Sequence, residues 1–202
     1  EKAVELTKKR EGKARYTFIL AQLYQEKKNF LLATEAYGNV LKLNPDYKMR
    51  FNARISRAIA FDVKGSDSKA IKKELNKMLK DIKNEEFKDQ IYFALAELAL
   101  KEDNEPLAVE LLQKSINTSV SNNKQKSLSY LRLADLYFDR PNYIAAQERY
   151  DSTLQFLPEE HPEYFPTEDK NNNLKDLVRN LKIIKLQDSL LVLSNLSTGD
   201  RE

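Results

Sequence analysis

Apolar residues recur along this chain at helical spacing, and short polar breaks divide them into pairs of helices. The clearest pair lies in residues 127–158. Its first stripe comprises Tyr130, Leu133, Ala134 and Tyr137, and its second comprises Ala145, Ala146, Tyr150 and Leu154. Residues 139–142 separate the stripes, and Pro158 ends the second because proline cannot continue the backbone hydrogen bonding. The pattern predicts two short amphipathic helices joined by a turn.

Pairs of alanines mark where the two helices of each pair should touch. Ala134 and Ala146 are twelve residues apart, a spacing that places two small side chains opposite each other in a helix hairpin. The same offset separates Ala21 from Ala33, Ala58 from Ala70, and Ala96 from Ala108. The first alanines follow one another at steps of 37, 38 and 38 residues. We therefore predict four helix hairpins, in residues 14–47, 51–83, 89–118 and 127–158.

The second hairpin is the weakest of the four. Glu74 stands where the first and fourth hairpins have an aromatic residue in their second helix, at Tyr37 and Tyr150. Its turn is expected at residues 65–68, where Ser66 or Asp67 is suited to cap the following helix.

The ends of the chain predict incomplete repeats. Residues 1–13 fit the end of a preceding helix, with Ala3 and Leu6 at packing positions and Gly12 in a turn. We expect residues 159–166, with two prolines, to be an extended connector. Residues 159–202 as a whole should comprise this connector and, after it, a capping helix that is kinked or broken near residue 187, or part of a fifth repeat. The apolar positions of that segment are Leu174, Leu177, Val178, Leu181, Ile184, Leu190, Leu191, Leu193 and Leu196.

Composition supports an all-α protein. The chain has 202 residues, of which 41% are hydrophobic and 32% charged, and its 4 Gly and 6 Pro are too few for the turns of a many-stranded sheet. The net charge of +3 is unevenly spread, because residues 1–90 hold 21 Lys and Arg against 13 Asp and Glu. This basic half suits nucleic acid or an acidic polymer, although lysines interleaved with acids on a polar helix face are also typical of a solvated surface.

No residue pattern indicates catalysis. The chain has no Cys, and its one histidine, His161, lies between Glu160 and Pro162 without a second metal ligand nearby. No glycine-rich phosphate loop or nucleophile motif occurs. We therefore expect neither an enzyme nor a cofactor, metal or small-molecule substrate.

The alanine and aromatic pattern, with a proline closing the unit, resembles the tetratricopeptide repeat, although that repeat is about 34 residues long. The resemblance implies a superhelical solenoid whose concave wall is lined by the first helix of each hairpin and binds an extended peptide or a partner helix. Counted from the start of each hairpin, the candidate groove residues are Arg15, Phe18, Gln22, Asn52, Asp62, Phe93, Glu97, Leu100, Asp135 and Phe138. Other wall residues, among them Ile55, Ile59 and Leu131, are equally well explained by packing between helices.

Three stretches carry a more specific resemblance: TKKREGKARYTFILAQLYQ, LADLYFDRPNYIAAQERYDSTLQFLPEEHPEY and NLKDLVRNLKIIKLQDSLLVLSNLS. In this order they resemble the tetratricopeptide-repeat lipoprotein of the Bacteroidetes type IX secretion and gliding motility machinery, the SprE/PorW family. The resemblance implies a periplasmic, outer-membrane-associated scaffold whose partners are envelope components of the secretion system. It also implies a lipid anchor outside the present chain. The alternative function is electrostatic binding of nucleic acid or an acidic polymer through the basic N-terminal half.

Overall fold

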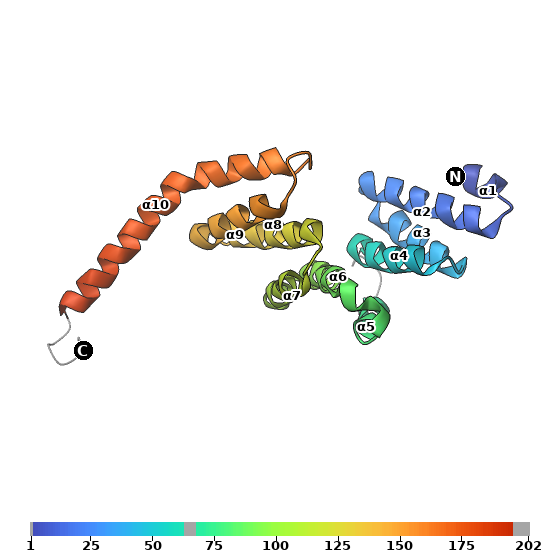
Figure 1. The fold of residues 1–202 in the computed structure, drawn as a ribbon, viewed down its shortest axis with the longest axis horizontal. Helices are drawn as coiled ribbons and strands as arrows, with labels where there is room; N and C mark the ends of the chain where they lie inside the picture. Colours follow the sequence, from blue (N-terminus) through green and yellow to red (C-terminus); the bar gives the residue numbers. More distant parts are fainter. Residues whose placement is uncertain (1, 63–67, 196–202) are drawn as a thin grey trace. The chain divides into compact units, whose positions relative to one another are not determined.

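A computed structural model describes residues 2–62 and 68–195, and every regular element in these residues is a helix (Figure 1). The chain divides into two compact units, Glu1–Val120 and Ser121–Glu202. The first contains α1 (Lys2–Leu6), α2 (Arg10–Glu26), α3 (Phe30–Lys42), α4 (Tyr47–Ala60), α5 (Lys69–Leu79), the 3₁₀ helix η1 (Ile82–Phe87), α6 (Lys88–Lys101) and α7 (Glu105–Thr118). The second contains α8 (Asn123–Asp139), α9 (Tyr143–Phe156) and α10 (Tyr164–Asn195). The predicted all-α class, with each helix packed against neighbouring helices, is confirmed.

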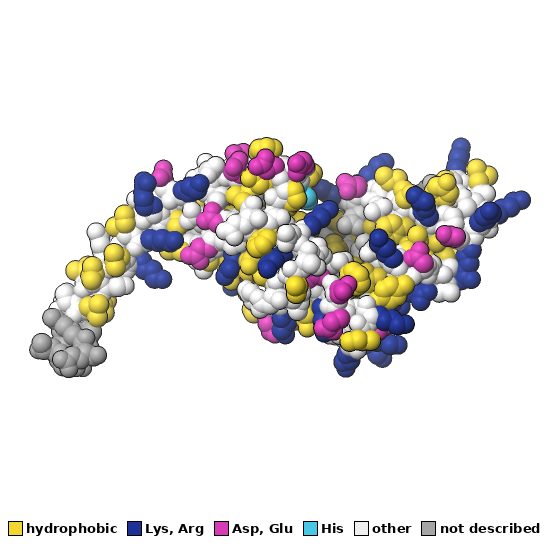
Figure 2. Space-filling view, viewed as in Figure 1, with side chains coloured by type: hydrophobic (Ala, Val, Ile, Leu, Met, Phe, Trp, Pro, Cys, Tyr) yellow, Lys and Arg dark blue, Asp and Glu magenta, His cyan; other side chains and the backbone are white. Residues whose placement is uncertain are grey.

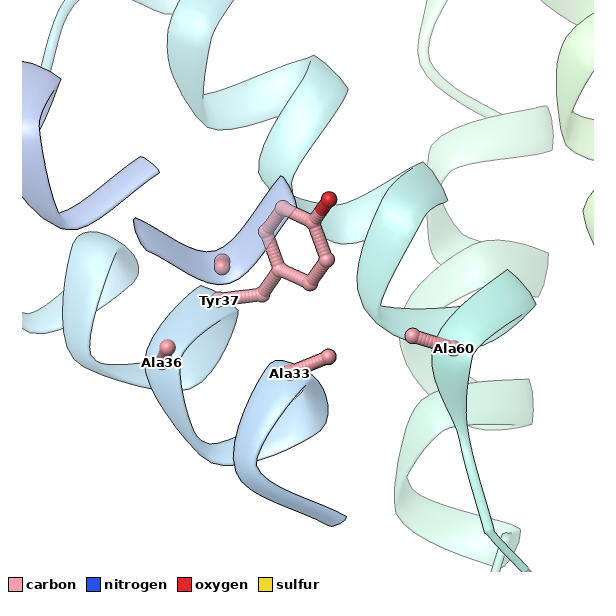
Figure 3. Packing of buried hydrophobic residues seen from close by; sticks show 5 residues of the cluster. Ala33, Ala36, Tyr37 and Ala60 are labelled. Atoms are coloured by element: carbon pink, nitrogen blue, oxygen red, sulfur yellow. The ribbon is translucent and has the colours of Figure 1, made fainter. Parts of the chain in front are cut away.

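Three hairpins have closely packed helices: α2 with α3, α6 with α7, and α8 with α9. In each of them both members of the alanine pair are fully buried, so the helices approach where the side chains are smallest. Four residues after the second alanine, a larger side chain fills the space beside them. These side chains are Tyr37, Leu112 and Tyr150, and each is no more than 1% exposed. In Figure 3 Ala33 and Tyr37 of α3 face Ala60 of α4, so this core joins the first hairpin to the helix that follows it.

The turns of these three hairpins share one geometry. An asparagine at the N-cap, Asn29, Asn104 or Asn142, accepts a hydrogen bond from the backbone N–H three residues later, at 3.3, 3.3 and 3.4 Å. The backbone N–H of each asparagine donates to the carbonyl five residues earlier, at 2.9 Å in all three. These bonds satisfy donors and acceptors that a helix end leaves unpaired. The recurrence shows that the hairpins are built in the same way.

The second hairpin is different, and the prediction that Ala58 and Ala70 pack together is wrong. Ala58 is fully buried, but Ala70 is exposed. Helix α5 packs more extensively against α6 than against α4, with Ile71, Leu75 and Met78 buried. The reason is that Glu74 occupies the position that Tyr37, Leu112 and Tyr150 fill in the other hairpins, and a carboxylate buried there would lose its solvation. The turn predicted at residues 65–68, with Ser66 or Asp67 as cap, lies mostly outside the described residues, and Ser68 makes no side-chain capping bond.

The N-terminal prediction also needs correction. Gly12 is not in a turn but in the first part of α2, which begins at Arg10. A Cβ atom at Gly12 would lie 3.1 Å from the Thr7 Cγ2 atom, so glycine allows the α1–α2 turn to approach the helix closely. Ala3 and Leu6, predicted to pack, are exposed, and Leu6 is 80% exposed.

At the other end, α10 is one unbroken helix, so the predicted break near residue 187 is wrong. Neither glycine nor proline occurs at residues 187–189, and Ser189 donates to the Lys185 carbonyl within the helix. The helix also begins inside the predicted connector, at Tyr164, because Pro166 lies in its first turn, where its missing N–H needs no partner. The predicted apolar position Leu196 lies outside the described residues.

Only the first part of α10 packs against the hairpin before it. Leu174 and Val178 are buried with Ala134, Ala146 and Tyr150. From Ile183 onward the apolar side chains are exposed, and Figure 2 shows them gathered at the C-terminal end of this helix. None of the helices in residues 2–62 and 68–195 combines the length and the hydropathy that a bilayer crossing requires.

Candidate functional site

The predicted groove residues are distributed over both units. In the first unit they lie on α2, on or just after α4, and on α6, and in the second they lie on α8. Arg15 and Gln22 are exposed, and Phe138 is 39% exposed. The remaining ones are half-buried: Phe18, Asn52, Asp62, Phe93, Glu97, Leu100 and Asp135. Within the first unit α4 packs against α6, so their candidates lie on neighbouring helices.

Two of these predicted residues are engaged inside their own hairpin. The Phe18 ring packs edge-on against Tyr37, with 5.4 Å between ring centroids, and belongs to the border of that core. The Phe138 ring packs in the same way against Tyr143, at 5.7 Å. Their exposed parts remain available as anchors, but both rings also hold the hairpin together.

Asp135 is likewise occupied by its own unit. Its Oδ1 atom accepts a hydrogen bond from the Tyr150 hydroxyl at 2.7 Å and another from Lys170 Nζ at 2.9 Å. Lys170 also lies over the Tyr150 ring, 5.7 Å from its centroid. Burial, reinforced by the hydrogen bond to Asp135 and its charge, raises the pKa of the Tyr150 hydroxyl. Lys170 of α10 and Tyr150 of α9 therefore already bind the carboxylate that was predicted to meet a partner.

A groove that the sequence did not predict lies between α4 and α5. Its volume is about 760 Å³. Two contacts between residues far apart in sequence hold its sides. At one end the Tyr47 hydroxyl bonds to Asn84 Oδ1 and donates to the Lys83 carbonyl at 3.1 Å. At the other end Arg54 Nε lies 2.6 Å from Glu74 Oε1, and Arg57 lies 4.0 Å from the other oxygen of that carboxylate. The groove exists because Glu74 forms this ion pair instead of filling the hairpin.

The lining of this groove is mixed in character. Its apolar part comprises Tyr47, Phe51, Ala70 and Met78, and its charged part comprises Arg54, Lys73, Glu74, Lys77, Lys80 and Asp81. Phe51 is buried and packs against Phe87, with 5.2 Å between ring centroids. Both carboxylates already have partners, since Glu74 pairs with Arg54 and Asp81 accepts a bond from the Lys83 N–H at 3.1 Å. Lys73 and Lys77 stand on the exposed side of α5, and Lys80 is exposed directly after the last residue of that helix.

A second recess, of about 460 Å³, lies among α1, α2 and α3. Its wall includes Val4, Leu20, Tyr24 and Leu32 together with Lys13 and Glu35. Its lining also contains Thr17 and Asn39, so it combines apolar, charged and neutral polar side chains.

The sequence contained signals for the missed groove. The aromatic position held Glu74, and lysines recurred at positions 73, 77 and 80, which share one helix face. The sequence did not indicate that Arg54, twenty residues earlier, forms an ion pair with the Glu74 carboxylate. Among the described residues, no group of His, Asp and Glu side chains is arranged to hold a metal ion.

No model of a known protein family matches the chain, and no curated protein sequence matches it.

Proposed function

We propose that this chain is part of a tetratricopeptide-repeat solenoid that acts as a non-enzymatic scaffold and binds other proteins. One observation carries the proposal: the same hairpin occurs three times, with a buried alanine pair, a buried large residue four positions on, and an asparagine-capped turn. Repeated units of this kind have binding surfaces made of many side chains, with no need for a reactive centre.

The biological setting that we propose comes from the sequence resemblance described above. It is the type IX secretion and gliding motility machinery, with the chain in the periplasm, associated with the outer membrane through a lipid anchor outside this chain. The proposed partners are envelope proteins of that machinery. Neither a cofactor nor a small-molecule substrate has a place in this function.

Site-specific photo-cross-linking tests the proposal. A photoreactive phenylalanine analogue replaces Phe93 on α6, and in a matched control it replaces Glu110 on the exposed side of α7. Each variant is incubated with an envelope extract of a Bacteroidetes bacterium that carries the secretion machinery, and adducts are identified by mass spectrometry. We expect secretion components to cross-link to the Phe93 variant at least about tenfold more than to the control. Equal labelling of both positions, or no envelope protein in the adducts, would contradict the scaffold role.

The second candidate function, binding of nucleic acid or an acidic polymer by the basic half, is favoured by the exposed Lys73, Lys77 and Lys80 of the α4–α5 groove. A salt titration separates it from protein docking. Binding that depends on phosphate neutralisation weakens about a thousandfold or more between 50 and 200 mM salt when several phosphates are contacted. Apolar docking at Phe93 responds to salt far less.

A further inference from the structure

We propose that the α4–α5 groove binds an extended acidic peptide segment of a partner protein, with an apolar side chain of the peptide seated on the groove floor. The inference rests on the proposed scaffold function and assigns a partner chemistry to one place on it. The groove lies where Glu74 replaces the large buried side chain of the other hairpins, Tyr37, Leu112 or Tyr150.

Charge is the first argument for an acidic occupant. The lining contains four cationic side chains, Arg54, Lys73, Lys77 and Lys80, against two carboxylates. Both carboxylates of the lining already have partners: Glu74 pairs with Arg54, and Asp81 accepts a hydrogen bond from the Lys83 N–H at 3.1 Å. The three groove lysines thus face solvent with their charge available, and Figure 2 shows Lys and Arg side chains gathered over α5. A ligand that brings carboxylates complements this field.

Shape is the second argument, and it favours a peptide over a nucleic acid. The floor contains Phe51, Met78 and the methyl group of Ala70, a surface for an aliphatic or aromatic side chain. Glu74 and Asp81 stand among the cations, and they would repel the unbroken row of charges of a phosphate backbone. A peptide can place its carboxylates next to the lysines and neutral residues next to Glu74 and Asp81.

The sides of the groove are held in place before any ligand arrives. Tyr47 bonds to Asn84, and Asn84 in turn donates to the Met78 carbonyl at 2.8 Å, which joins the end of α5 to the start of α4. Lys72 and Ser68 bond to Glu102 and so fix the other end of α5 to the end of α6. A peptide therefore meets a preformed site and pays little for ordering it.

Fluorescence anisotropy with the whole chain tests the proposal. The probe is a fluorescein-labelled peptide of about twelve residues, long enough in extended form to cross a groove between two helices, in which Glu and Gly alternate around a central Phe. Two variants probe the site: Lys73→Glu with Lys77→Glu reverses the charge, and Ala70→Trp fills the floor. The matched control, Lys8→Glu with Lys9→Glu, makes the same change in net charge at exposed positions of the same unit. Circular dichroism confirms that each variant is folded.

We expect the double charge reversal and Ala70→Trp each to weaken binding by about tenfold or more, and the control to stay within about twofold of the original chain. Three results would overturn the proposal. The first is no binding of the peptide at protein concentrations up to ~1 mM, since a dissociation constant above that value corresponds to a marginal interaction. The second is equal weakening by both double variants, which indicates diffuse charge attraction. The third is Ala70→Trp binding as the original chain does, which places the peptide outside the groove.

An oligothymidine of matched charge serves as competitor. If it displaces the peptide at lower concentration than the peptide's own dissociation constant, the groove is a nucleic-acid site and the proposal is wrong. The outcome is separable from the scaffold function. If envelope proteins cross-link at Phe93 but the acidic peptide does not bind, the peptide site at the α4–α5 groove is wrong and the scaffold function still stands.

Discussion

A single side chain, four residues after the second alanine of each hairpin, accounts for the difference between two kinds of hairpin. The three closed hairpins have closely packed helices, and the open hairpin, α4 with α5, has a groove between its helices. Tyr37, Leu112 and Tyr150 fill that place in three hairpins and are buried. Glu74 takes it in the second, and its carboxylate remains partly exposed beside Arg54, with 28% side-chain exposure. An apolar or aromatic side chain gains free energy by burial, whereas a carboxylate must keep a cation or water beside it. The same backbone pattern therefore leads to a core in one case and to a groove in the other.

Tyr150→Phe tests the energetics at this position. The change removes the bond to the Asp135 carboxylate, and we expect the free energy of unfolding of the second unit to fall by about 1.5–3 kcal/mol. Tyr37→Phe loses a bond to the neutral Gln25 Oε1 atom, 2.9 Å away, and should cost only about 1 kcal/mol. Hydrogen exchange of amides in α9 and α3 measures the two effects. Equal losses in the two variants would contradict a special role for the charged acceptor.

The same hydroxyl predicts a dependence on alkaline pH. Burial and Asp135 raise the pKa of Tyr150 above its ordinary value of 10.0, so the folded chain keeps a proton that the unfolded chain loses above about pH 10. The stabilisation is complete below the unfolded pKa and declines as the pH rises beyond it. We expect the stability difference between the original chain and Tyr150→Phe to shrink between pH 8 and pH 11, as measured by urea unfolding followed through α9. A constant difference over this range would exclude the linkage.

Whole helices begin and end where their caps allow. The residue before the capping asparagine has a left-handed backbone in two of the hairpins, with φ of 57° at Lys28 and at Asp103. This conformation costs an L-residue with a side chain about 1–2 kcal/mol and costs glycine almost nothing. The chain accepts that cost because the bonds of Asn29 and Asn104 close the turn. In α10, by contrast, no such turn interrupts the helix between residues 164 and 195.

Lys28→Gly tests the left-handed backbone conformation at this turn. Glycine relieves the left-handed strain, so we expect the free energy of unfolding to rise by about 0.5–1 kcal/mol. The neighbouring Lys27 has a φ of −77°, and Lys27→Gly should lower stability by a similar amount because glycine only adds freedom to the unfolded chain. Thermal unfolding followed by circular dichroism compares the two variants. A loss of stability in Lys28→Gly would contradict the assigned turn.

On the scale of the whole molecule, the chain comprises two units, and α10 belongs to the second. The burial of its side chains differs between the first part of the helix and the remainder. Its first part buries Thr167, Asn171, Leu174 and Val178, and Asn171 donates to Asp151 of α9 at 2.6 Å. The remainder exposes a series of large apolar side chains, among them Leu190 at 55% and Leu191 at 61%. The contribution of α10 to the stability of the second unit therefore comes from the first part of the helix.

Leu174→Ala and Leu190→Ala form a matched pair on this helix. Leu174 is 5% exposed within the core of the second unit, and its truncation should cost about 2–4 kcal/mol through lost burial and a residual cavity. Leu190→Ala should change stability by less than about 0.5 kcal/mol. Because the chain has two units, hydrogen exchange resolved by residue is the suitable measurement. A comparable loss in both variants would show that the C-terminal part of α10 is also packed.

Much of this protein follows from local sequence alone. The helical spacing of apolar residues, the alanine pairs and the asparagine turns determined the helix class and the three closed hairpins, because each depends on residues within one turn or one hairpin. The break near residue 187 was wrong because polar residues without glycine or proline do not end a helix. Tertiary structure decided what local patterns do not encode. Arg54 forms an ion pair with Glu74 beside the groove, Lys170 of α10 forms one with Asp135, and only the first part of α10 packs against the rest of its unit. Those outcomes depend on which helix lies opposite, since the solvation of a charge is settled by its neighbours in space.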